Sequence, residues 1–226
     1  MDFDAVIFDL DGTLADTLDD IADAMNRVLA ARGFSPHSPA AYKLMIGGGL
    51  RNLVGESLPP EQRSAETIAA CLDETIAGYR EHCLDKTRLY EGVPELLEEL
   101  RGRGVALAVL SNKADELTRR IVAALCGPGT FTAVVGARPG VPLKPDPAAA
   151  LLVADGLGAA PARIAYVGDS GVDMRTARGA AMIALGVSWG FRTRDELLDC
   201  GAVAVLDHPR ELLALRDQAR DEVTPA

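Results

Sequence analysis

The chain opens with a short apolar run that is interrupted by acidic residues. Residues 5–10 are nearly continuous in apolar character and include β-branched side chains, which is typical of a strand buried in a parallel sheet. Asp9 interrupts the run near its carboxyl end, and Gly12 follows closely, so the chain can turn there. The pattern predicts a buried first strand that ends at two carboxylates, Asp9 and Asp11.

The apolar period then becomes helical. Between residues 16 and 32 the apolar side chains form one stripe, and Gly33 can end the helix in a left-handed conformation. A stretch punctuated by proline and glycine follows, and a second helical run covers about residues 60–82. No strand signal occurs between residues 14 and 84, a span too long for a loop in a compact domain, so we expect a helical insertion. The stripe of the first helix consists of Leu18, Ile21, Met25, Val28 and Leu29.

Beyond Pro94 strand and helix patterns alternate. Asn112 is the expected cap of one helix, Asp146 with Pro147 begins another, and residues 221–226 form an expected frayed tail. Strands are predicted at residues 105–110, 132–135 and 164–167, with weaker candidates at 183–185 and 202–205. Helices are predicted around residues 93–100, at 114–125, from 146 onward and at 209–216.

This alternation predicts an α/β fold with a Rossmann-like three-layer core, a mostly parallel sheet covered by helices on both faces. We expect residues 1–14 and 86–226 to form the core domain and residues 15–85 to form the inserted helical domain. In such sheets the binding site lies at the carboxyl ends of the strands. Polar residues stand at predicted strand ends, and a site is therefore expected at Asp9, Asp11, Ser111, Asn112 and Asp169.

Composition narrows the possible partners and the compartment. The formal net charge of −10 argues against nonspecific binding to nucleic acid or to anionic membranes, because both require clustered lysine and arginine. No basic region precedes the first apolar run and no apolar stretch has the length of a membrane span. The four cysteines contain no C-x-x-C pair, so reduced thiols are expected. We therefore expect a cytoplasmic protein.

Asp9-Leu10-Asp11-Gly12-Thr13 is the first segment with candidate chemistry. Two carboxylates this close at a strand end repel each other unless a cation is present, and magnesium is the default ion when phosphate is the substrate. A calcium-binding EF-hand requires a preceding helix and a glycine at the sixth loop position, and neither is found. A plain turn with two solvated aspartates stays open at this point.

Three further segments are individually weak signals. Ser111 and Asn112 follow a predicted strand and offer a hydroxyl and an amide to phosphate oxygens, although Ser-Asn is also a common helix cap. Prolines on both sides of Asp146 fix the direction of Lys144, which can neutralise a phosphoryl group or be a solvated loop lysine. Asp169 can reach a metal and Asp173 lies one helical turn further on, although both can simply cap and solvate a helix.

Taken together, the four segments resemble the motifs of the haloacid dehalogenase superfamily over nearly the whole chain. The D-x-D-G-T motif matches residues 9–13, the Ser or Thr motif matches Ser111, the Lys motif matches Lys144, and G-D-x-x-x-D matches residues 168–173. The resemblance implies a magnesium-dependent phosphatase with a helical cap. The acid at Asp11 distinguishes this chain from the dehalogenases themselves, which lack it.

The resemblance also implies roles for individual residues. Asp9 is the nucleophile and Asp11 the general acid and base. Magnesium is held by the Asp9 carboxylate, the Asp11 main-chain oxygen and Asp169, while Asp173 orients Lys144 or a metal-bound water. The phosphate-binding residues are expected to be Gly12, Thr13, Ser111, Asn112 and Lys144.

The inserted helices resemble the caps that select the substrate in this superfamily. Residues 46–51 are the expected specificity loop, in which Gly48 offers a backbone N–H and Arg51 can pair with a carboxylate or a second phosphate. A flexible turn with a solvated arginine is the alternative. The segment looks most similar to phosphoglycolate phosphatases, so 2-phosphoglycolate or a similar small phosphorylated metabolite is the expected substrate.

Other functions stay open at this stage. Sugar-phosphate, nucleotide and pyrophosphate phosphatases have similar caps, and a phosphoglucomutase-like transferase uses the same motifs. Phosphonate-cleaving relatives carry a cap lysine where approximate alignment places Leu50, which argues against that chemistry. A non-enzyme alternative is a phospho-accepting receiver module, but its Lys-Pro pair ends the fold, whereas another strand follows Lys144 here. The roles of Trp189 and Phe191, as rim or as core, and the oligomeric state are not determined by the sequence.

Overall fold

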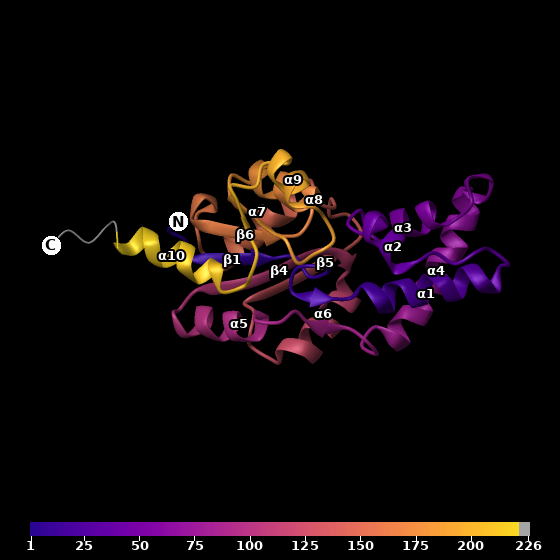
Figure 1. Ribbon diagram of the computed structural model, residues 1–226, viewed down its shortest axis with the longest axis horizontal. Coiled ribbons are helices and arrows are strands. Elements are labelled where there is room, and N and C mark those ends of the chain that lie inside the picture. Colours follow the sequence, from indigo (N-terminus) through magenta and orange to yellow (C-terminus); the bar gives the residue numbers. More distant parts are fainter. Residues whose placement is uncertain (222–226) are drawn as a thin grey trace.

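A parallel sheet forms the centre of the molecule (Figure 1). The structure is a computed structural model that describes residues 1–221, with side chains as far as residue 217. Every neighbouring pair of its strands is parallel, which confirms the predicted α/β fold. In order across the sheet, the strands are β5 (Ala133–Ala137), β4 (Ala106–Ala114), β1 (Ala5–Phe8), β6 (Ile164–Gly168), β7 (Ile183–Val187) and β8 (Ala204–Leu206).

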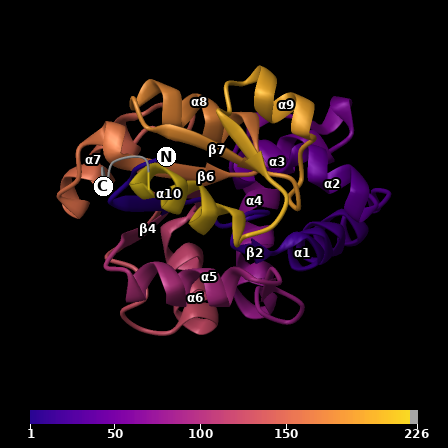
Figure 2. The same ribbon diagram turned by 60° about the vertical axis from the view of Figure 1, so that its left-hand side comes forward.

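Alternation along the central strand creates the three layers. Val6 and Phe8 pack on one face of the sheet with helices α5, α6 and α10, whereas Ala5 and Ile7 pack on the other with α7, α8 and α9. Because successive side chains of a strand point to opposite faces, a strand buried on both sides must be apolar throughout. Figure 2 shows the two helical layers on either side of the sheet. The helices are α5 (Val93–Gly102), α6 (Asp115–Cys126), α7 (Ala148–Leu157), α8 (Gly171–Gly179), α9 (Arg194–Asp199) and α10 (Glu211–Asp221).

Four helices, here called the cap, lie together beyond the carboxyl ends of the strands, at the opposite end of the molecule from the N-terminus (Figure 1). Helices α1 (Leu18–Ala31) and α4 (Ala65–His82) confirm the two predicted helical runs. The other two, α2 (Pro39–Met45) and α3 (Leu50–Ser57), were not predicted, because the prolines and glycines around them resemble a connecting segment. In fact Pro39 occupies the first turn of α2, where its missing N–H is harmless.

Two short strands connect the cap to the core. Strand β2 (Ala15–Asp16), at the edge of the span that carries no strand signal, pairs antiparallel with β3 (Arg88–Leu89). Two residues are too few to create a strand pattern in the sequence. In this pair, the segment that leaves the core for the cap lies beside the segment that returns. The expected domain boundaries near residues 14 and 86 are next to it.

Some predicted element ends differ from the structure. Strand β4 continues to Ala114, so Asn112 lies within the strand and does not cap α6, whose N-cap is Ala114. Helix α7 begins at Ala148, and Asp146 accepts a hydrogen bond from its backbone N–H. Helix α9 was not predicted, and the predicted frayed tail lies, apart from Asp221, outside the described residues. None of the described helices combines the length and the apolar character that crossing a membrane requires.

Asp20, in α1, binds the segment in which the chain returns from the cap to the core. Its buried carboxylate accepts hydrogen bonds from the backbone N–H groups of Lys86 and Thr87 at 3.0 and 2.9 Å, and from the Thr87 hydroxyl at 2.8 Å. Removal of the acceptor would leave buried donors without a partner. We expect Asp20→Ala to lower the free energy of unfolding by about 2–4 kcal/mol, as measured by urea denaturation.

The neighbouring residue provides the matched control. Asp19 is exposed in the same first turn of α1, so Asp19→Ala loses only a weak helix-dipole interaction of about 0.5 kcal/mol. Equal losses in the two variants would show that the Asp20 contacts do not stabilise the connection.

Candidate active site

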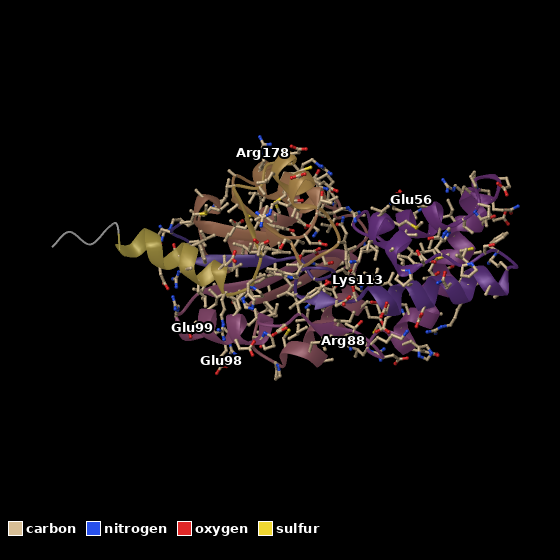
Figure 3. The ribbon with its side chains drawn as sticks, viewed as in Figure 1. Glu56, Arg88, Glu98, Glu99, Lys113 and Arg178 are labelled. Carbon is tan, nitrogen blue, oxygen red and sulfur yellow. The ribbon has the colours of Figure 1, made fainter. Side chains whose placement is uncertain are left out.

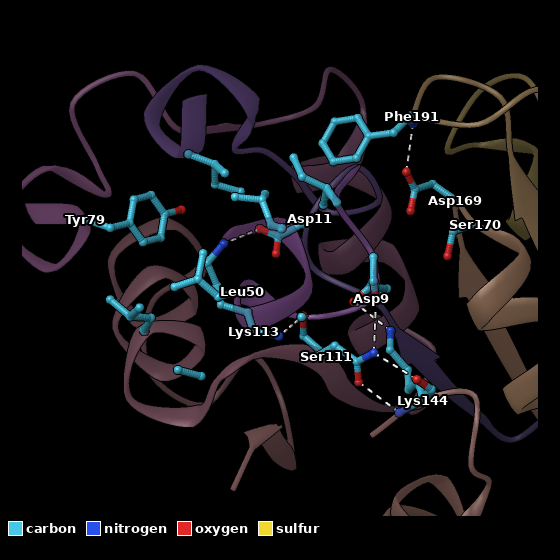
Figure 4. Close-up of a pocket in the computed structure, with 18 of the residues that line it drawn as sticks. Asp9, Asp11, Leu50, Tyr79, Ser111, Lys113, Lys144, Asp169, Ser170 and Phe191 are labelled. Atoms are coloured by element: carbon cyan, nitrogen blue, oxygen red, sulfur yellow. Dashed lines mark hydrogen bonds and ion pairs between the residues drawn. The ribbon is translucent and has the colours of Figure 1, made fainter. Parts of the chain in front are cut away.

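A cavity of about 60 Å³ lies between the carboxyl edge of the sheet and the cap (Figure 4). Residues from both sides of this junction line it, and Figure 3 shows Lys113 there. The sheet therefore brings together residues predicted from four separate segments. From the core these are Asp9, Asp11, Ser111, Asn112, Lys144 and Asp169; from the cap the lining includes Ile21, Leu50, Leu53 and Tyr79.

Lys144 occupies the middle of the acidic residues. Its Nζ lies 2.6 Å from Asp173 Oδ1 and 2.9 Å from Asp9 Oδ1, and it donates to the Leu110 carbonyl at 3.2 Å. Burial lowers the pKa of Lys144, but the Asp173 and Asp9 carboxylates outweigh it and hold the pKa well above the ordinary value. The ammonium group is therefore a fixed positive charge beside Asp9. Two of its donors are used in hydrogen bonds to Asp173 and to the Leu110 carbonyl.

Asp9, Asp169 and Asp173 form a buried carboxylate cluster. Their nearest oxygens all lie within 4.8 Å of one another. Burial, together with the neighbouring carboxylates, raises the pKa of Asp9 to about 7 despite Lys144, and raises that of Asp169 well above its ordinary value. Such crowding favours either bound protons or a divalent cation.

The donor set fits magnesium. The cluster offers hard carboxylate oxygens, and Asp9 Oδ1, although ion-paired with Lys144, is buried without a hydrogen-bond donor among the described residues. Asp173 differs, because its Oδ2 accepts from the Ser170 N–H and hydroxyl while its Oδ1 contacts Lys144. Asp9 and Asp169 are thus the members best suited to turn toward an ion.

Two glycines fix the position of Asp169. Gly12 has φ +82°, and a Cβ there would lie 2.2 Å from Asp169 Oδ2. A Cβ at Gly190 would lie 2.3 Å from the Asp169 Cβ, and the Phe191 N–H donates to Asp169 Oδ2 at 2.7 Å. Any side chain at either glycine would displace the carboxylate, so the loop that contains Gly190 belongs to the site, a question that the sequence left open for its neighbours Trp189 and Phe191.

Asp11 faces the cap rather than the carboxylate cluster. Its Oδ1 accepts from the Thr17 hydroxyl at 2.7 Å and pairs with Lys113 Nζ at 2.5 Å (Figure 4). Burial lowers the pKa of Lys113, but its interactions with Asp11 and with the Tyr79 hydroxyl together outweigh burial and keep the pKa raised. Sequence reasoning missed both partners. The one available signal was that Lys113 follows a buried strand directly after Ser111 and Asn112.

Asn112 links three segments through its side chain. Its Nδ2 donates to the carbonyls of Lys144 and Gly47, both at 3.0 Å, and its Oδ1 accepts from the Lys144 N–H at 2.9 Å. The side-chain amide therefore positions the Lys144 backbone and contacts the cap. Ser111 lines the cavity beside it.

Gly12 and Thr13 lie behind the cavity rather than in its lining. The Thr13 carbonyl accepts a hydrogen bond from Trp189 Nε1 at 3.0 Å. Trp189 thus packs against the motif loop from outside, whereas the ring of Phe191 reaches the cavity (Figure 4). These contacts answer the question that the sequence left open for the two aromatic residues.

The expected specificity loop is only partly at the cavity. Gly47, Gly49 and Leu50 line it, but the structure does not bring Gly48 and Arg51 there, and both are exposed. Arg51 lies in the first turn of α3, which turns it away from the site.

An arginine from the core holds this loop instead. Arg192, which also lines the cavity, donates to the carbonyls of Lys43, Leu44 and Ile46, the last at 2.7 Å. Its guanidinium therefore binds the C-terminal end of α2 to the core.

Comparison with known proteins agrees with this geometry. An N-acetylmuramic acid 6-phosphate phosphatase from Pseudomonas aeruginosa is 32% identical over 216 residues, 95% of each chain. A phosphoglycolate phosphatase from Aquifex aeolicus is 31% identical, covering 94% of this chain and 96% of the relative. The crystal structure of a proposed phosphoglycolate phosphatase from Lactobacillus delbrueckii subsp. bulgaricus superposes with a TM-score of 0.89 at 29% identity, covering 96% of this chain and 99% of the other.

A family model supports the same conclusion. The model for haloacid dehalogenase-like hydrolases matches residues 6–187, which include all four motifs and the cap. The phospho-accepting receiver is thereby set aside, and the chain belongs to the haloacid dehalogenase-like hydrolase family.

Proposed function

We propose that this protein is a magnesium-dependent phosphomonoester hydrolase that acts through an aspartyl-phosphate at Asp9. The observation that carries the proposal is the position of Asp9, at the end of the central strand, in contact with the Lys144 ammonium and within the Asp169 and Asp173 cluster. A carboxylate in these surroundings is desolvated and held in one place, as a nucleophile requires.

Two displacements at phosphorus make up the reaction. Asp9 attacks phosphorus, the bond from phosphorus to the alcohol oxygen breaks, and Asp11 gives its proton to that oxygen. Water then attacks the phosphorus of the aspartyl-phosphate and loses a proton to Asp11, and the bond to Asp9 breaks. Inorganic phosphate leaves, and both aspartates return to their starting state.

The remaining residues stabilise charge on the phosphoryl group. Lys144, Ser111 and the backbone N–H of Asn112 contact the phosphoryl oxygens. Asp173 positions the Lys144 ammonium. Asp9, Asp169 and the Asp11 main-chain oxygen would hold magnesium, which would supply the positive charge that an anionic nucleophile needs to approach an anionic ester.

The proposed substrate is 2-phosphoglycolate or a similar small phosphorylated acid. Support comes from phosphoglycolate phosphatases that are similar to this chain, such as the relative from Rhodospirillum rubrum, which is 34% identical over 90% of this chain. A sugar-phosphate substrate is the second candidate, supported by the N-acetylmuramic acid 6-phosphate phosphatase at 32% identity. Phosphate release with and without magnesium, across both esters, hexose phosphates, nucleotides and pyrophosphate, separates these candidates.

A mutase would use the same first step. In that case the phosphoryl group of Asp9 passes to a hydroxyl of a second molecule rather than to water. Phosphate release that matches substrate loss excludes this alternative, whereas isomerised ester without free phosphate supports it.

Replacement of Asp9 tests the nucleophile. Asp9→Asn keeps the size of the side chain but removes the attacking carboxylate, so we expect kcat to fall by at least about 10³-fold while the circular dichroism spectrum is unchanged. Mass spectrometry of the wild-type protein during turnover should show a phosphoryl group on Asp9. Asp155→Asn, an exposed carboxylate on α7, is the control and should retain full activity. Unchanged kcat in Asp9→Asn would refute the assignment.

The raised pKa of Asp9 gives the direction of the pH dependence of metal binding. Burial and the neighbouring carboxylates give Asp9 a folded-state pKa of about 7, above its ordinary value of 3.8, so the metal-free folded protein keeps a proton that the unfolded chain has released. Between these two pKa values the metal-free protein therefore loses stability as pH rises. A divalent ion must displace that proton, so its affinity falls as pH falls below about 7.

Thermal unfolding measures this competition. Magnesium should raise the melting temperature more at about pH 8 than at about pH 6, with roughly tenfold weaker binding at the lower pH. Asp169→Asn should abolish most of the magnesium effect, whereas Asp155→Asn should preserve it. An equal magnesium effect at both pH values, or in both variants, would contradict the proposed ligand set.

A further inference from the structure

Lys113 is a buried cation that the proposed mechanism does not use. Its side chain is only 6% exposed, lines the cavity, and makes one hydrogen bond among the described residues, to Asp11 Oδ1. An ammonium group has three donors, so two make no hydrogen bond of normal geometry, although the neighbouring Tyr79 hydroxyl contributes to the raised pKa of Lys113. The other cavity-lining cations differ: Lys144 is surrounded by Asp9, Asp173 and the Leu110 carbonyl, and Arg192 is bound to carbonyls of the cap.

Tyr79 adds a second unused donor beside Lys113. Tyr79 is 2% exposed and lines the same cavity from α4. Lys113 Nζ lies 4.8 Å from the centroid of the Tyr79 ring. Its hydroxyl has no hydrogen-bond partner of normal geometry within the described part of the chain, and in Figure 4 it points toward Lys113. A buried hydroxyl without a partner is costly, so a ligand atom that accepts from it would be strongly favoured.

The wall around these two groups is mainly apolar. Ile21, Ala24 and Leu117 line the cavity together with them. A few polar groups in an apolar pocket fix how a ligand is oriented. Asp11, the proposed acid, contacts Lys113, so these donors lie on the side where the alcohol part of the ester departs.

From this arrangement we propose that Lys113 Nζ and the Tyr79 hydroxyl bind a carboxylate on the leaving group, and that the preferred substrates are phosphate esters of hydroxy acids. The inference rests on the proposed function and assigns its specificity to one core residue and one cap residue. A carboxylate on the substrate would give the buried Lys113 cation a second negative partner beside Asp11.

Two esters that differ only in this group test the inference. In 2-hydroxyethyl phosphate a neutral hydroxymethyl group replaces the carboxylate of 2-phosphoglycolate. We expect wild-type kcat/KM to favour 2-phosphoglycolate by at least about tenfold, the usual size of a charge-assisted contact. Lys113→Met should reduce this ratio to about one, and Tyr79→Phe should reduce it about threefold. The ratio cancels any general effect of losing the Lys113 contact with Asp11.

Lys86→Met is the matched control. Lys86 makes an exposed ion pair with Asp23 far from the cavity lining, so this variant should keep the wild-type ratio. A wild-type ratio near one, or a Lys113→Met protein that keeps the preference, would overturn the proposal and leave Lys113 as a positioning residue for Asp11.

Binding separates this inference from the proposed function. Calorimetric titration of Asp9→Asn protein with the two esters needs no turnover, and it should show the same preference, lost when Lys113→Met is added. If the wild-type protein hydrolyses neither ester but this preference is found, the carboxylate site stands and the hydrolase proposal fails. If hydrolysis is found and neither kinetics nor binding shows the preference, the hydrolase proposal stands and the carboxylate site fails.

Discussion

The crowding of negative charge at the carboxyl edge of the sheet determines the organisation of the site. Asp9, Asp11, Asp169 and Asp173 are all buried there, and the lysines in contact with them are Lys144 and Lys113. Four carboxylates thus face two lysines, an excess of two negative charges, which is the charge that one divalent ion can balance. Burial, together with this repulsion between carboxylates, raises the pKa values of Asp9 and Asp169. Bound protons reduce the repulsion when no metal ion is present.

Close backbone approach makes this crowding possible. Gly12 and Gly190 enclose Asp169, and at Gly168 a Cβ would lie 2.3 Å from that of Asp173. Larger residues would separate the carboxylates and weaken the site for a small hard cation. The cap is joined to this edge by polar contacts, since Asn112 reaches Gly47 and Arg192 reaches the carbonyls at the end of α2. The cavity is therefore enclosed by segments that meet through hydrogen bonds as well as apolar packing, since cap and core side chains belong to one buried cluster.

The expected specificity residues of the glycine-rich loop do not line the cavity. Gly48 and Arg51 are exposed, whereas Tyr79 and Lys113 face the cavity and have unused donors. On the proposed specificity, discrimination among phosphate esters would depend on one cap residue and one core residue rather than on one loop. Such a pair forms only when cap and core are in contact, which couples the choice of substrate to the exclusion of water.

The sequence by itself determined the parallel sheet, because the apolar runs that end at Asp9, Leu110 and Val167 are typical of strands buried on both faces. It also predicted that the motif residues would meet at one edge of the sheet, where Asp9, Lys144 and Asp169 do lie together, because parallel strands place their carboxyl ends at one edge. Helices α2 and α3 were missed because proline and glycine are ambiguous between a connecting loop and a helix start. Only the tertiary structure revealed the contacts of Lys113, Tyr79 and Arg192, because these residues meet across separations of 34 to 149 positions in the chain, beyond the reach of any local pattern.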